Sequence, residues 1–139
     1  MREDLERVVL EYVESFNDYD LERLGTVLAP EVEYSGFGDQ ARGTGRESFL
    51  AMVEQVKAAD AETRGSLRRM VLDAEANVAV AFVDVRRSDP ELPTLRVTTL
   101  LTVGDDGNIV RLSEQHRRLT DKPWDVCEDW PIPPFLPVE

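Results

Sequence analysis

The chain has 139 residues, of which 28 are Asp or Glu and 16 are Lys or Arg, so its formal charge is −12 at pH 7. This length is typical of one domain that buries a core without disulfides or metal ions. The negative charge disfavours nucleic acid and anionic membranes as partners, because both require a positively charged surface.

The cellular compartment is inferred from the single cysteine and from the amino terminus. Cys127 cannot form an intramolecular disulfide and has no evident catalytic partner, so a reducing compartment fits best. The first residues are charged and helical in pattern, without the apolar core of a signal peptide. No stretch approaches the roughly 20 apolar residues of a membrane helix. We therefore expect a soluble, cytoplasmic protein.

Three helices are predicted in the first part of the chain. The first carries one apolar stripe with a period of about 3.6 residues, made of Leu5, Val8, Val9, Tyr12, Val13 and Phe16. Asp20 is expected to cap a second, short helix that ends at Pro30. A short strand at 32–34 and a glycine-rich loop at 35–45 follow. Thr44 and Glu47 then predict a capping box at the start of a third helix, which fades near Ala59.

The period then changes to two, which predicts four long strands at 67–73, 78–87, 95–103 and 109–119. Asp105-Asp106-Gly107-Asn108 predicts a hairpin turn between the last two. Five prolines exclude regular structure from residue 122 onward, yet that segment also contains Trp124, Trp130, Ile132 and Phe135. We expect one domain at 1–121 and an extended proline-rich arm at 122–139, packed on the domain or on a second subunit. The alternative is a disordered tail.

This order of elements resembles the nuclear-transport-factor-2-like superfamily, with its SnoaL-like and limonene-epoxide-hydrolase-like members. The residues that carry the resemblance are the first helix, Gly43–Phe49, Asn77–Phe82 and Gly107–Val110. The resemblance implies an α+β, cystatin-like cone, in which three N-terminal helices pack on a curved, mostly antiparallel sheet around one pocket. It also implies a homodimer.

Side chains alternate along a strand, so each strand offers two candidate inward faces. On the second long strand the resemblance favours Val78, Val80, Phe82, Asp84 and Arg86 as inward. The other set, Ala79, Ala81, Val83 and Val85, would then lie on an apolar outer face that suits a dimer. On the later strands the expected inward sets are Val97, Thr99 and Leu101, and Leu112, Glu114 and His116. Tyr34 is expected to point inward from the short first strand.

The predicted site therefore has catalytic and substrate-binding parts. Asp84 and Glu114 are the expected acid/base pair, assisted by His116. The expected substrate-binding residues are Tyr34, Phe82, Arg86, Thr99 and Leu112. Asp84 and Glu114 resemble the two acids of the limonene-epoxide-hydrolase-like group. In that comparison Phe82 stands where the group has a bridging arginine, and Gly36 stands where it has a water-holding asparagine.

Those departures favour a cofactor-independent cyclase or epoxide-opening enzyme acting on a small, largely apolar or polyketide-like molecule. Several alternatives remain open. Asp84 could form a structural ion pair with Arg86, and His116 could be a hydrogen-bonded wall residue. One histidine with scattered carboxylates is a weak case for a metal, so no metal or other cofactor is expected. The whole domain could also be a non-catalytic module for ligand binding or dimerisation.

Overall fold

Helices and strands follow one another in the predicted order. The computed structural model describes residues 2–36, 42–92 and 94–118. The helices are α1 (Arg2–Asn17), α2 (Leu21–Thr26) and α3 (Arg46–Ala59). The strands are β1 (Leu28–Ser35), β2 (Arg42–Thr44), β3 (Arg64–Asp73), β4 (Val78–Arg86), β5 (Leu95–Val103) and β6 (Ile109–Arg118). The predicted arm at 122–139 and the boundary at residue 121 lie outside the described residues.

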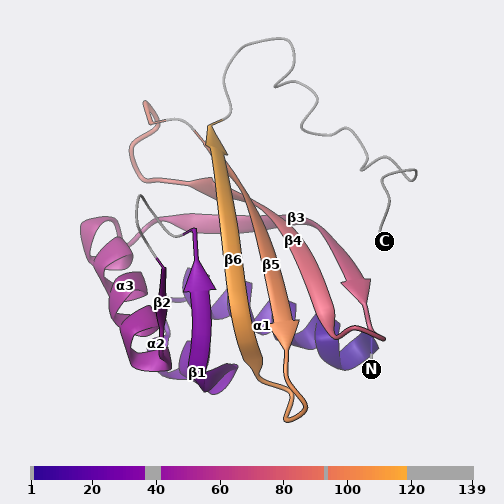
Figure 1. The fold of residues 1–139 in the computed structure, drawn as a ribbon. Coiled ribbons are helices and arrows are strands. Elements are labelled where there is room, and N and C mark those ends of the chain that lie inside the picture. The colour runs from indigo at the N-terminus through magenta and orange to yellow at the C-terminus, as the bar shows by residue number, and fades with distance from the viewer. Residues whose placement is uncertain (1, 37–41, 93, 119–139) are drawn as a thin grey trace.

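The six strands form one sheet in the order β2-β1-β6-β5-β4-β3. β1 runs parallel to β6, and all other neighbouring strands are antiparallel. Figure 1 shows α1 crossing one face of the bent sheet, while α3 lies at the edge formed by β1 and β2. The predicted α+β architecture, with three helices on a mostly antiparallel sheet, is confirmed.

The helix α1 packs against β3 and β4, and the apolar stripe that its spacing predicts contributes to the core. Leu5, Val8 and Val9 are almost completely buried there. Burial of each such side chain stabilises the folded state by about 1.5–3 kcal/mol. The rest of the core comes from α2, α3 and the inner sheet face: Leu24, Leu28, Val32, Phe49, Val53, Ala79, Ala81, Val83, Val97, Leu101, Ile109 and Leu112. None of the helices in the described part of the chain has the length and apolar character needed to cross a membrane.

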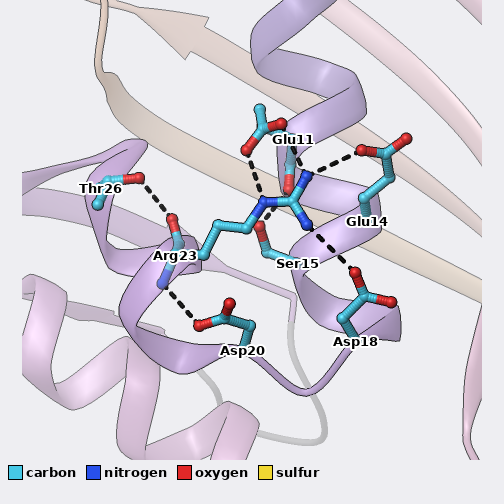
Figure 2. Close-up of polar contacts among 7 residues, drawn as sticks. All are labelled: Glu11, Glu14, Ser15, Asp18, Asp20, Arg23 and Thr26. Carbon is cyan, nitrogen blue, oxygen red and sulfur yellow. Dashed lines mark hydrogen bonds and ion pairs between the residues drawn. The ribbon is translucent and has the colours of Figure 1, made fainter.

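A cluster of charged side chains joins α1 to α2 (Figure 2). The Arg23 guanidinium donates to both carboxylate oxygens of Glu11, each at 2.8 Å, and to Glu14 at 2.9 Å and Asp18 at 3.2 Å. The Asp20 carboxylate accepts from the Arg23 backbone N–H at 3.0 Å, which confirms the predicted cap of α2. The hydrogen bond to Glu11 raises the pKa of Arg23 above its ordinary value, so the Arg23 guanidinium keeps its positive charge.

Two predictions about the connections are wrong. The second helix ends at Thr26, and β1 already begins at Leu28, so Pro30 lies inside a strand. The register between β1 and β6 shifts between Leu28 and Glu33, and a strand tolerates proline at such an irregularity because no ladder hydrogen bond is lost there. This pairing is a long-range contact, which local pattern does not reveal.

The capping box also fails. Thr44 belongs to β2, and the N-cap of α3 is Gly45, with φ 112° and no side-chain cap. Instead, the Ser48 hydroxyl in the first turn lies 3.2 Å from the Thr44 carbonyl oxygen and 3.1 Å from that of Gly45. Pairing of β2 with β1 takes Thr44 away from the capping position.

The end of α3 is held by two charged side chains. Lys57 is fully buried, donates to the Thr63 carbonyl oxygen at 2.6 Å, and lies 4.4 Å from the centroid of the Phe16 ring. Burial lowers the pKa of Lys57. Asp60 accepts from the backbone N–H groups of Glu62 at 3.1 Å and Ser88 at 2.9 Å. Asp60 therefore ties the end of α3 to the segment that follows β4.

The Asp60→Asn change removes one of the two oxygens that accept these bonds. The bond from Ser88 lowers the pKa of Asp60 below its ordinary value of 3.8. Because the pKa is lower in the folded state, the ionised carboxylate stabilises the folded protein when the pH is above the ordinary pKa. This stabilisation is lost as the pH falls through the folded-state pKa. We expect Asp60→Asn to lower the Tm at neutral pH, with the difference from the wild type shrinking below about pH 4. Scanning calorimetry at several pH values measures the difference in Tm between the wild type and Asp60→Asn, with Glu62→Gln as the control.

The same Tm difference at all pH values would contradict a stabilising role for the ionised Asp60 carboxylate.

Candidate functional site

A cavity of about 700 Å³ lies between the helices and the inner face of the sheet. This volume lies within the range of small-molecule sites, about 300–1,000 Å³. Most of its wall is apolar and comes from α1, α3, β4, β5 and the β4–β5 connection: Val13, Phe16, Met52, Val53, Val56, Val83, Val85, Leu92, Leu95 and Val97. The cavity therefore presents a largely apolar surface.

Three polar side chains of the cavity wall converge on the carboxylate of Glu114. Glu114 Oε2 accepts from the Tyr12 hydroxyl at 3.3 Å and from the Thr99 hydroxyl at 3.1 Å. Glu114 Oε1 lies 3.0 Å from His116 Nε2. All four residues line the cavity. Contacts on both oxygens hold the carboxylate in one orientation, which is the pre-organisation that proton transfer requires.

Tyr12 reaches this cluster from α1, where its ring packs 6.5 Å from the ring of Phe49. Burial raises the pKa of the Tyr12 phenol well above its ordinary value, and the nearby Glu114 carboxylate raises it further. Tyr12 therefore stays protonated at neutral pH and acts as a hydrogen-bond donor.

His116 lies at the wetter side of the cluster, with its side chain 36% exposed against 12% for Glu114. An ionised carboxylate only accepts hydrogen bonds, so the imidazole nitrogen that faces it carries a hydrogen. In the neutral ring this leaves the lone pair on Nδ1, for which no partner is found in 2–36, 42–92 or 94–118. This arrangement makes Nδ1 available as a proton acceptor.

Strand pairing decides which side chains share the cavity face. Thr99 lies opposite Glu114, and Val97 lies opposite His116. Val97 in turn lies opposite Val83 on β4, and directly paired residues point to the same side of a sheet. The inward face of β4 is therefore the set Ala79, Ala81, Val83 and Val85. The prediction that this set lies outside is wrong.

Phe82, Asp84 and Arg86 consequently lie on the outer face of the sheet, and the prediction that they line the pocket is wrong. Asp84 is directly opposite Arg96 of β5. Both Asp84 oxygens accept from the Arg96 guanidinium, the second at 3.2 Å, and Arg68 lies 3.7 Å away. The Asp84 and Arg96 side chains are only 8% and 13% exposed. An ion pair was one of the alternatives, but its partner comes from the neighbouring strand and is not Arg86.

Two further predicted site residues face inward without lining the cavity. Leu112 is completely buried in the core. The Tyr34 hydroxyl lies 2.8 Å from the Ser48 hydroxyl, and its ring meets Phe49 edge-on at 5.3 Å. Thus Glu114, His116 and Thr99 are brought together as predicted, whereas Tyr34 and Leu112 pack beside them.

Gly36 has a structural role at this site. Its φ is +85°, and a Cβ atom there would lie 1.8 Å from the Glu114 carbonyl oxygen. Only glycine allows the end of β1 to pass this close to the strand that carries Glu114.

Tyr12, Asp60 and Arg87 also line the cavity, and the sequence patterns did not mark them as functional. Tyr12 was assigned to the core stripe of α1. The available signal was its hydroxyl, which needs a polar partner when buried. In the part of the chain that the structure describes, no group of three or more His, Cys, Asp or Glu side chains is placed to hold a metal ion.

If Asp84 is structural, Asp84→Ala should destabilise the fold and leave the cavity chemistry intact. Removing one member of a buried pair leaves the other charge unpaired, which costs about 3–5 kcal/mol. Urea unfolding should show a loss of this size for both Asp84→Ala and Arg96→Ala. The exposed pair between Glu33 and Arg111 serves as the control, and Glu33→Ala should cost at most about 1 kcal/mol. A wild-type unfolding free energy for Asp84→Ala would refute the structural role.

Comparison with solved structures finds the same fold in several bacterial proteins. A candidate ketosteroid isomerase from Kribbella flavida superposes with a TM-score of 0.74 at 20% identity, covering 88% of this chain and 84% of that one. IdmH, a candidate polyketide cyclase from Streptomyces antibioticus, gives a TM-score of 0.69 at 19% identity, covering 81% and 91%. A candidate polyketide cyclase from Sinorhizobium meliloti gives 0.69 at 23% identity, covering 83% and 99%.

At these identities the likeness establishes the fold and not the activity. None of the curated proteins compared with this chain matches it significantly. A family signature does match, and it spans residues 9–112, which include the second half of α1, the other two helices and most of the cavity wall, and end before Glu114 and His116. This chain belongs to the SnoaL-like domain family.

Proposed function

We propose that this protein is a cofactor-independent acid/base enzyme that isomerises or cyclises a small, largely apolar carbonyl compound. The observation that carries the proposal is the contact between His116 Nε2 and Glu114 Oε1 in the wall of the cavity. A carboxylate that orients an imidazole is a common arrangement for a general base at neutral pH.

The chemistry follows from this arrangement. His116 Nδ1 accepts a proton from the carbon next to the substrate carbonyl, and the electron pair of that C–H bond forms an enolate. The Glu114 carboxylate stabilises the resulting imidazolium. If the substrate is a β,γ-unsaturated carbonyl compound, the enolate is a dienolate, and its γ carbon takes the proton back from His116 to give the isomer. Alternatively, the enolate carbon attacks a second carbonyl of the same molecule. In the second case the new alkoxide receives the proton from His116, so no co-reactant is needed.

The apolar wall supports both outcomes, because it excludes water and holds a folded substrate in a reactive geometry. The fold-level likeness to candidate ketosteroid isomerases and polyketide cyclases agrees with proton transfer next to a carbonyl. Epoxide opening by a pair of acids has less support, since Asp84 lies on the other face of the sheet and pairs with Arg96.

Loss of the proposed base should slow the exchange of protons on the carbon next to the carbonyl. The probe is β-tetralone, an apolar ketone, whose exchange of C–H for C–D in D₂O is followed by NMR. We expect Glu114→Gln and His116→Gln to slow the enzyme-dependent exchange by about 10²–10⁴-fold, the usual contribution of a general base. Gln115 lies between them on the opposite face, so Gln115→Ala serves as the control.

Two results would count against the enzyme. Equal exchange rates in the wild type and both variants would remove Glu114 and His116 from the reaction. If the wild type binds the ketone and does not accelerate exchange, the alternative of a non-catalytic binding module gains support.

We also propose that the protein forms a homodimer through the outer face of the sheet. Val71 and Leu100 are 39% and 40% exposed there, and exposed apolar groups on a sheet commonly mark an interface. Leu100→Glu should shift the mass in light scattering from dimer to monomer. The control is Leu92→Glu, since Leu92 is 42% exposed but lies at the cavity. A wild type that is monomeric, or a dimer that survives Leu100→Glu, would refute this interface.

A further inference from the structure

One end of the cavity is lined by charged groups that the proposed proton transfer does not use. Asp60, Arg87 and Asp89 all line the cavity. The two carboxylates are directed toward the backbone: Asp60 accepts from the N–H groups of Glu62 and Ser88, and Asp89 accepts from the Glu91 N–H at 2.9 Å. Arg87 is the only Lys or Arg among the described lining residues.

The Arg87 guanidinium has no ion pair or hydrogen bond with any residue in 2–36, 42–92 or 94–118. Some other arginines of the described chain are paired, for example Arg23 with Glu11 and Arg96 with Asp84, but none of these lines the cavity. A guanidinium presents five N–H donors in a planar fork that matches a carboxylate. At the edge of an apolar cavity, such a group is a suitable partner for the anionic end of a ligand.

The distance between Arg87 and the catalytic cluster follows from the sheet. His116, Val97 and Val83 lie in one cross-strand row, and two strand spacings separate the ends of that row by about 10 Å. Arg87 lies four residues beyond Val83, or about 13 Å along the strand direction. The Cα atoms of His116 and Arg87 are therefore about 16 Å apart by this geometry. The long arginine side chain shortens that span.

We infer that the ligand of this cavity is amphipathic, with an apolar body and a carboxylate end that binds Arg87. The apolar body lies along the wall between α3 and the sheet and places its reactive part at Glu114 and His116. The reactive end rests on the proposed function, whereas the carboxylate end does not. Because the chain as a whole carries a charge of −12, its general field repels anions. A local cation is thus the means of admitting one.

The test compares two probes of nearly equal shape, decanoate and decanamide, by isothermal titration calorimetry. The wild type should bind decanoate more tightly than the neutral amide. Arg87→Gln should weaken decanoate binding by about two- to five-fold, the range expected for an exposed ion pair, and leave decanamide binding unchanged. Arg86→Gln is the matched control, because it removes the same charge one residue away on the outer face.

Two outcomes would overturn the inference. One is a wild type that does not prefer decanoate to decanamide. The other is Arg87→Gln and Arg86→Gln weakening decanoate binding equally, which would show a general effect of net charge. Binding of these probes requires no turnover. A failed exchange experiment with Glu114→Gln would therefore leave this result standing, and the reverse also holds.

Discussion

Hydrogen bonding between β4, β5 and β6 is the constraint on which the site depends. Glu114 pairs with Thr99, and Thr99 pairs with Ala81. Because side chains alternate with a period of two, these pairs place one alternate set of residues from each strand on the same face. The helices cover one face of the sheet only. The pairing therefore decides which alternate residues of each strand become core and cavity wall, and which face outward.

This constraint separates two carboxylates that the sequence makes look equivalent. Glu114 falls on the covered face, where Tyr12, Thr99 and His116 meet it. Asp84 falls on the outer face, where Arg96 takes both of its oxygens. Each carboxylate is mostly buried, and each is satisfied by hydrogen bonds, as buried charges require. The partners of Glu114 line the cavity, where a substrate can reach them, whereas both oxygens of Asp84 are occupied by the cross-strand ion pair with Arg96.

The chemistry of the cavity follows from the contrast between its wall and its polar cluster. An apolar wall strengthens the electrostatic interactions inside it and offers few competing partners to a bound molecule. Burial keeps the Tyr12 phenol protonated, so it donates to the Glu114 carboxylate, which also contacts the imidazole of His116. At the other end, Asp60 joins α3 to the segment after β4 and so helps to shape the opening at which Arg87 lies.

The sequence by itself determined the element order, the α1 stripe, the cap at Asp20 and the inward set of β6, because these follow from local periodicity and turn chemistry. The inward set of β5 was expected from the resemblance to the family. The sequence also nominated Glu114, His116 and Thr99 for the site. Only the tertiary structure decided which set of β4 side chains points inward. Both alternating sets are apolar enough to be buried, and the choice depends on the pairing with β5. The β1–β6 pairing, the contact between Tyr12 and Glu114, and the bonds from Asp60 likewise join residues far apart in the chain. Local pattern does not encode such contacts, which arise when the helices pack on the sheet.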